Sequence, residues 1–229
     1  VVATLAATCL CLSASWTVYT RIDEVTRPAA GGDPDRASLI LLFFGAGAVC
    51  GNFAVGRLTD RFGPARVIVG AAPLLVAAVT VTPPIAATFA GALAAAVCWG
   101  TLHWMINVPQ QLRATAAAPS AAPLVLGLHQ STIYIGISIG GATGAAGDAL
   151  GGRAGIGYAA LLVGLAGLAV LVLSLRLDRR TPPAPDPEHR TAAHPEPDVR
   201  SRAENAVVTG GHVVSGCPEV AGQPVELAE

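Results

Sequence analysis

The chain has 229 residues, of which 52% are hydrophobic and 13% charged, and its 14 basic and 15 acidic residues give a net charge of −1. Soluble domains usually carry about 25% charged residues, so a soluble helical protein would have too few polar faces to cover its core. A membrane protein is therefore the better interpretation. The near-zero net charge gives no indication of a nucleic-acid partner.

The five cysteines form no C-x-x-C pair, and four of them lie in apolar runs: Cys9, Cys11, Cys50 and Cys98. A free Cys in such surroundings acts as a small hydrophobic residue. The fifth, Cys217, lies in the C-terminal region with His189, His194 and His212, which show no ligand spacing. The sequence therefore predicts no disulfide framework, no metal site and no cofactor.

Six apolar runs follow one another through the first 180 residues, at about 1–20, 37–55, 66–82, 85–106, 123–146 and 156–177. Each is close to the roughly 20 residues with which a helix crosses a bilayer. Polar segments or helix breakers separate them: the polar loop 21–36, Pro83-Pro84, the mixed segment 107–122, and Gly151-Gly152. We therefore predict an all-α membrane protein, with six transmembrane helices in one bundle over residues 1–180.

The composition changes at residue 181. Prolines and charged residues alternate over residues 182–197, and little apolar surface follows up to residue 229. Such a segment cannot bury enough apolar area to offset the entropy of ordering its backbone. We predict a disordered tail over residues 181–229.

The placement of arginine predicts the orientation, because cytoplasmic loops carry the excess of basic residues. On one side of the predicted spans lie seven arginines: Arg57, Arg61, Arg66, Arg113, Arg176, Arg179 and Arg180. On the other side lie four: Arg21, Arg27, Arg36 and Arg153. The first side is therefore predicted to be cytoplasmic, with the tail on that side of the cell membrane.

A charged loop, G-R-L-T-D-R-F-G-P-A-R at residues 56–66, separates the second and third runs. Gly56 and Gly63 suit a helix end and a tight turn, and Pro64 suits the first turn of the next helix. Asp60 is suited to a helix N-terminus, and the arginines suit pairing with Asp60 or lipid phosphates. From the residues alone, an ordinary turn on the positive side of the membrane remains the alternative.

The order Gly-x-Leu-x-Asp-Arg-x-Gly, followed by a basic residue, resembles the signature loop of the major facilitator superfamily of secondary transporters. It is formed here by Gly56, Asp60, Arg61, Gly63 and Arg66. The resemblance implies that this loop serves gating and stability rather than substrate contact. Pro64-Ala65 departs from the family pattern, which often has a basic residue directly after the second glycine.

A second stretch extends the resemblance to the drug and sugar efflux branch of that superfamily. It comprises Pro109-Gln110-Gln111-Leu112-Arg113, then Ala118-Pro119, then a helix rich in small residues. In those transporters this stretch joins helices ten and eleven. The resemblance covers about residues 1–180 and implies the C-terminal half, helices seven to twelve, of a transporter with twelve helices.

The first residue, Val1, is not Met, and no charged segment precedes the first apolar run, which argues against a signal peptide. We expect a fragment whose partner is an absent N-terminal half of six helices. Its function would be to move a small molecule by alternating access, as an efflux carrier. The alternative is a membrane fragment that does not transport, or a half that needs a separate partner.

Polar residues inside membrane spans are candidates for function. We select Gln130, Tyr134, Asn52 and His103 as candidates for the substrate cavity; Gln130 and Tyr134 share a helix face because they are four residues apart. Hydrogen bonding between helices is the alternative for each. No carboxylate lies in the middle of a run, so proton coupling would use the absent half, His103 or His129.

The fifth run carries glycines every four residues, a spacing that lets transmembrane helices pack closely: Gly136, Gly140 and Gly144. Residues 136–140 also match the hydrolase pattern Gly-x-Ser-x-Gly around Ser138. That pattern requires a strand-to-helix turn, which an apolar helix does not supply. We therefore predict that the protein is not an enzyme.

Overall fold

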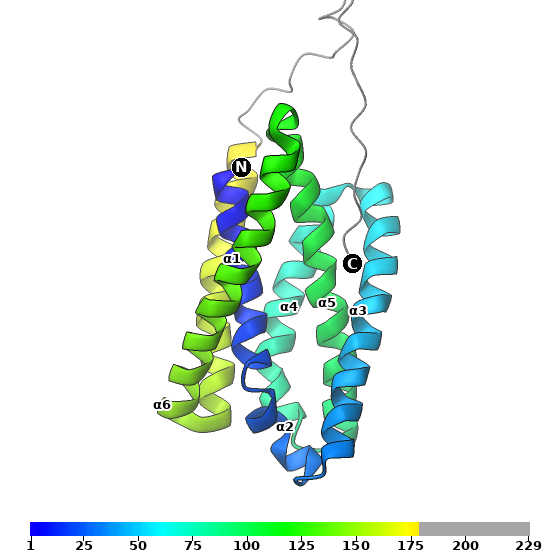
Figure 1. Ribbon diagram of the computed structural model, residues 1–229, viewed down its shortest axis with the longest axis vertical. Helices are drawn as coiled ribbons and strands as arrows, with labels where there is room; N and C mark the ends of the chain where they lie inside the picture. The colour runs from blue at the N-terminus through cyan, green and yellow to red at the C-terminus, as the bar shows by residue number, and fades with distance from the viewer. Residues whose placement is uncertain (179–229) are drawn as a thin grey trace, which may run out of the picture. The chain divides into compact units, whose positions relative to one another are not determined.

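The computed structural model describes residues 1–178, and within this range all regular structure is helical. Figure 1 shows the elements: α1 (Val2–Tyr19), α2 (Ile22–Ala30), α3 (Pro34–Phe62), α4 (Pro64–Ile85), α5 (Phe89–Ala116), the 3₁₀ turn η1 (Pro119–Ala121) and α6 (Ala122–Asp178). Five helices are long and apolar enough to cross a membrane. The predicted all-helical membrane class is confirmed, while the tail predicted at 181–229 lies outside the described residues.

The last helix, α6, reverses direction at two glycines. Gly151 has φ −155° and ψ 20°, and Gly152 has φ 55° and ψ −142°, so neither is helical. The positive φ of Gly152 favours glycine. A Cβ added at Gly147 would lie 2.6 Å from the carbonyl oxygen of Gly155, so the two arms touch. Figure 1 shows these arms side by side, in green and yellow; we call residues 122–150 the first arm and 153–178 the second arm.

The predicted polar loop 21–36 is wrong in one respect, because it contains the short helix α2. Val25 and Ala29 are buried one turn apart, whereas Asp23 and Arg27 are exposed or partly exposed, so the segment is amphipathic. Pro28 lies inside this helix, and the helix ends at Gly31, whose φ is 64°. The glycine, rather than the proline, therefore ends α2.

The long helices extend beyond the apolar runs that predict them. α3 runs from Pro34 to Phe62, instead of from 37 to 55. The Asp33 side chain accepts a hydrogen bond from the Asp35 backbone N–H at 2.9 Å, and Pro34 occupies the first turn. Hydropathy falls where the chain reaches water, but the helical hydrogen bonds continue until a capping residue stops them.

The predicted ends of the third and fourth runs are also corrected, because these helices continue beyond their apolar residues. α4 continues through Pro83 and Pro84 to Ile85, and α5 begins at Phe89 and continues to Ala116. The segment 107–122, expected to be mixed, is thus largely helical. The Thr88 side chain accepts from the backbone N–H of Gly91 at 3.2 Å and caps α5, which places the true break at residues 86–88.

α1 is the most enclosed of the long helices, and it packs along both arms of α6. A Cβ added at Gly140 would lie 2.5 Å from the Cβ of Trp16, and one at Gly167 would lie 2.7 Å from the backbone N of Cys11. These helices therefore approach more closely than larger residues would permit. The first arm makes its contact through three glycines: Gly136, Gly140 and Gly144.

A second close contact joins α3 and α5. A Cβ at Gly47 would lie 2.3 Å from the Val97 carbonyl oxygen, and one at Gly51 would lie 2.4 Å from that of Thr101. The contact moves four residues forward on both helices, from Gly47 and Val97 to Gly51 and Thr101. The two helices therefore run in the same direction. This register places Asn52 at about the level of His103.

Candidate substrate-facing site

A single hydroxyl on α1 holds two ring side chains of α5. The Ser15 Oγ lies 2.6 Å from Trp99 Nε1, which donates to it, and 2.7 Å from His103 Nδ1. Trp99 and His103 are four residues apart, so both face α1 from successive turns. The Trp99, His103 and Ser15 side chains are all buried. The predicted cavity residue His103 therefore lies at the contact of α1 with α5.

Aromatic rings surround this contact. The Trp16 ring stands edge-on to His103, with centroids 5.4 Å apart and an interplanar angle of 87°. Trp104 contacts the other side of His103, at 5.9 Å between centroids, and is 36% exposed. Tyr19 and Phe44 continue the cluster toward α3, with centroids 5.4 Å apart. The imidazole is thus held in an aromatic surrounding, close to an exposed surface.

The first arm of α6 has two exposed flanks of different character. Tyr134 is 70% exposed, and Gln130 lies exposed one turn before it on the same flank. Leu128 and Ile135 are exposed on the other flank, the side on which Ala146 and Leu150 line a groove with the second arm. At 3.6 residues per turn, the polar flank therefore faces away from the second arm.

The charged loop is shorter than expected, because only Gly63 separates α3 from α4. Asp60 and Arg61 lie exposed in the last turn of α3, and Arg66 lies exposed in the first turn of α4. The Arg61 guanidinium is 5.3 Å from the centroid of the Phe62 ring. Within residues 1–178 no ion pair involves Asp60, so its carboxylate is free to meet a group outside this part of the chain.

The sequence model of the Major Facilitator Superfamily matches residues 2–216. The matched residues include the charged loop 56–66, the contact of Ser15 with Trp99 and His103, and the helix flank that carries Gln130 and Tyr134. This chain belongs to the Major Facilitator Superfamily. Because members of this superfamily are transporters, the chain is a multi-pass membrane protein of a transport family. The resemblance inferred from Gly56, Asp60, Arg61, Gly63 and Arg66 was therefore correct at the level of the superfamily.

The remaining predicted cavity residue of the facilitator chain, Asn52, is exposed on α3. Its Nδ2 donates to the Ala48 carbonyl oxygen of its own helix at 3.2 Å. Within the described range, Asn52 makes no hydrogen bond to His103 or Tyr134. Of the four candidates for the substrate cavity, His103 is buried between α1 and α5. The other three, Asn52, Gln130 and Tyr134, are exposed on helix surfaces.

His129 pairs with a residue that the sequence analysis did not select. Its Nε2 lies 3.1 Å from Asn107 Oδ1, which links the first arm of α6 to α5. His129 Nδ1 is enclosed and has no hydrogen-bond partner in the described part of the chain. His129 is fully buried.

A charged cluster at the end of α5 was also missed as a site. The Arg113 side chain is 5% exposed, and its guanidinium donates to Gln110 Oε1 at 2.5 Å and to Asp178 Oδ2 at 2.7 Å. It also donates to Ser174 Oγ at 2.8 Å, and that hydroxyl lies 3.2 Å from the hydroxyl of Thr4. One guanidinium thus ties together the ends of α1, α5 and α6.

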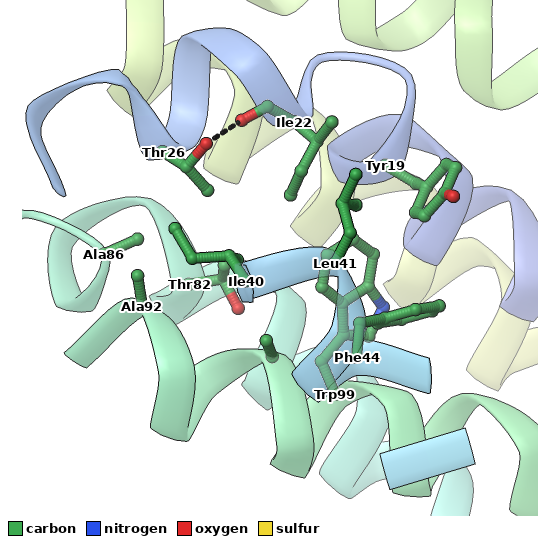
Figure 2. A pocket seen from close by; sticks show the side chains of 11 residues that line it. Tyr19, Ile22, Thr26, Ile40, Leu41, Phe44, Thr82, Ala86, Ala92 and Trp99 are labelled. Carbon is green, nitrogen blue, oxygen red and sulfur yellow. Dashed lines mark hydrogen bonds between the residues drawn. The ribbon is translucent and has the colours of Figure 1, made fainter. Parts of the chain in front are cut away.

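Figure 2 shows an enclosed gap between α2, α3, α4 and α5, lined by Tyr19, Ile40, Phe44 and Trp99 among others. Its volume of about 10 Å³ is at the lower limit for one water molecule. The two threonine hydroxyls in its lining are already used, since those of Thr26 and Thr82 donate to carbonyls of their own helices at 2.8 Å. This gap is a packing defect and not a substrate site.

Ser138 lies in the first arm of α6, where its hydroxyl donates to the Tyr134 carbonyl oxygen at 3.2 Å. The Gly-x-Ser-x-Gly sequence around it is therefore helical. The strand-to-helix turn that exposes a hydrolase nucleophile does not occur at this serine.

Proposed function

We propose that this chain forms six transmembrane spans, equivalent to helices seven to twelve of a facilitator. The two arms of α6 supply the fifth and sixth spans. If α6 were straight, its 57 residues would extend about 85 Å, whereas the hydrocarbon core is about 30 Å thick. The reversal at Gly151 and Gly152 lets each arm cross the bilayer once.

The proposed activity is secondary active efflux of a small molecule across the cell membrane by alternating access. A second half of six helices would cover the flank that carries Gln130 and Tyr134, and substrate would bind between the halves near mid-membrane. The observation that supports this proposal best is the 70% exposure of Tyr134 on a polar flank, since a flank facing only lipid would be apolar throughout. By the arginine placement, the loop containing Gly63 and the C-terminal tail face the cytoplasm.

Cysteine labelling tests which flank of the first arm faces water. In a background with the native cysteines replaced, Gln130→Cys and Tyr134→Cys should react with a charged, membrane-impermeant maleimide. Leu128→Cys and Ile135→Cys are matched controls, because they lie exposed at similar depth on the other flank. They should react at least about tenfold more slowly, since lipid does not support formation of the thiolate. Equal labelling of all four variants would contradict the proposal.

The charged loop is proposed to act in gating through Asp60. In a transporter that contains both halves, Asp60→Asn should reduce efflux of a neutral solute such as chloramphenicol several-fold, because it removes the charge that is free to meet a helix N-terminus. Membrane insertion and thermal stability should remain nearly unchanged, since Asp60 is exposed and unpaired within residues 1–178. Normal efflux by this variant would eliminate the gating role.

Flux measurements address whether the chain acts as half of a transporter. The purified chain in liposomes should show no chloramphenicol flux above that of empty vesicles, because one half alone cannot alternate access. Saturable flux by the chain alone would contradict the need for a second half.

A further inference from the structure

The hydrogen bonds of Ser15 determine which nitrogen of His103 carries the proton. An indole N–H only donates, so Ser15 Oγ accepts from Trp99 Nε1 at 2.6 Å. The Ser15 hydroxyl has one proton of its own, and the acceptor in reach is His103 Nδ1 at 2.7 Å. The hydroxyls on either side of Ser15 in α1 behave differently, since those of Ser13 and Thr17 donate to backbone carbonyls four residues earlier.

If the Ser15 hydroxyl donates to Nδ1, that nitrogen is an acceptor and the neutral imidazole carries its proton on Nε2. The described part of the chain offers no hydrogen-bond partner to Nε2, and this atom is not fully enclosed. His103 therefore presents an N–H donor that remains open to another molecule.

A second donor without a partner lies beside it. Trp16 Nε1 is enclosed and unpartnered in the described residues, and its ring is 5.4 Å from that of His103. Because the Trp16 N–H is enclosed, a bound molecule cannot reach it in this arrangement of side chains. The donor that a solute can approach is therefore the Nε2–H of His103.

We infer that Ser15 and Trp99 are positioning residues that hold His103 as the Nε2–H tautomer, so that it donates to an oxygen of a neutral solute. The inference rests on the proposed transport function. A cationic substrate would need a carboxylate, and all carboxylates of the described chain lie near helix ends: Asp23, Glu24, Asp33, Asp35, Asp60, Asp148 and Asp178. None of these carboxylates contacts His103 or Trp16 within the described chain.

Nitrogen NMR of the full chain tests the positioning without any substrate. The chain, labelled with ¹⁵N-histidine, is placed in lipid nanodiscs, and two-bond ¹H–¹⁵N correlations report the tautomer of each imidazole. His103 should show a protonated Nε2 and an unprotonated Nδ1. A dominant Nδ1–H form in the unmodified chain would overturn the inference and needs no variant to interpret.

Two variants show whether Ser15 and Trp99 set that tautomer. Ser15→Ala removes the donor to Nδ1, and Trp99→Phe frees Ser15 to accept from an Nδ1–H. Both should shift His103 to a mixture of tautomers, whereas His129, bonded to Asn107, should keep its signals as the internal control. If the His103 tautomer were unchanged in both variants, Ser15 and Trp99 would not be positioning residues. A purely structural contact would leave the nitrogen signals of His103 as they are.

Equilibrium binding to the same nanodiscs tests the ligand class. The probes are chloramphenicol, a neutral solute with amide and hydroxyl oxygens, and ethidium, a cation without oxygen. His103→Phe should weaken chloramphenicol binding by about 3- to 10-fold, the loss expected for one hydrogen bond. His103→Gln keeps an N–H donor and should recover part of that loss, while ethidium binding should not change.

The outcomes separate this inference from the proposed function. Ethidium binding that weakens as much as chloramphenicol binding, or binding of ethidium alone, would overturn the assigned ligand class. Because the proposed function places substrate between two halves, the titration is repeated with the second half present; failure of both probes to bind there would contradict a substrate site on this chain, and thus the proposed function. In that case the NMR measurement of the His103 tautomer would still decide whether Ser15 and Trp99 position this side chain.

Discussion

The cluster around Arg113 and the cluster around Ser15 both join α1 and α5, but they use their hydrogen-bonding groups differently. Arg113 lies at the helix ends and shares its charge with Asp178, Gln110 and Ser174. Ser15 lies about one turn before the end of α1, and the rings around it retain two N–H groups without acceptors. A cluster with paired charge holds helices together, whereas one with spare donors is suited to binding another molecule. Burial alone does not distinguish these two roles.

The largest expected effect comes from breaking the Arg113 cluster. Arg113→Met keeps most of the side-chain volume but leaves Gln110, Ser174 and Asp178 without their donor. Breaking a buried ion pair costs roughly 3–5 kcal/mol. Because the Asp178 side chain is 45% exposed, water compensates for part of this cost, and we expect about 2–3 kcal/mol. The free energy of unfolding in mixed micelles, measured by denaturant titration, checks this value.

Arg176→Met is the matched control for that measurement. Arg176 is exposed near the same end of α6, so its replacement should change the unfolding free energy by less than about 0.5 kcal/mol. Similar effects of the two substitutions would show that Arg113 does not hold the helix ends together.

The next effect in size concerns the contact that positions Trp16 in the Ser15 cluster. Gly140→Val places methyl groups where a Cβ would already lie 2.5 Å from the Cβ of Trp16. Overpacking of this kind costs about 1–3 kcal/mol and should also change the near-ultraviolet circular dichroism of the tryptophans. Gly127→Val on the same arm is the control, because no atom lies within 4 Å of its added Cβ. Equal stability of the two variants would refute the close contact of α1 with α6.

The two clusters also show where sequence-based prediction succeeds and fails. Apolar runs located the long helices and the reversal at Gly151 and Gly152, because the bilayer requires apolar length. They ended the fourth span at Ile106, however, while α5 continues to Ala116. Arg113 was therefore interpreted as a loop charge that reports orientation. Hydropathy identifies the part of a helix in lipid, but its capping residues determine where the helix stops.

Ser15 could not have been found from the sequence, since a serine in an apolar helix usually bonds its own backbone. Its partners Trp99 and His103 are 84 and 88 residues away, and only the packing of α5 on α1 brings them together. Gly47 and Gly51 are a different case, because they show the same four-residue spacing as Gly136 and Gly140. That spacing could have predicted the contact of α3 with α5.

The smallest expected effect comes from Ser15→Ala, which removes the centre of the second cluster without removing a charge. Trp99 is 1% exposed, so its Nε1 would lose its acceptor and could not reach water. One unsatisfied neutral donor costs about 1–2 kcal/mol, less than the loss expected at Arg113, because no ion pair is broken. Ser13→Ala is the control, since that hydroxyl donates to the Cys9 carbonyl oxygen of its own helix and its loss should cost less than about 0.5 kcal/mol. If Ser15→Ala were as destabilising as Arg113→Met, the Ser15 cluster would also be chiefly structural, and its spare donors would no longer indicate a binding site.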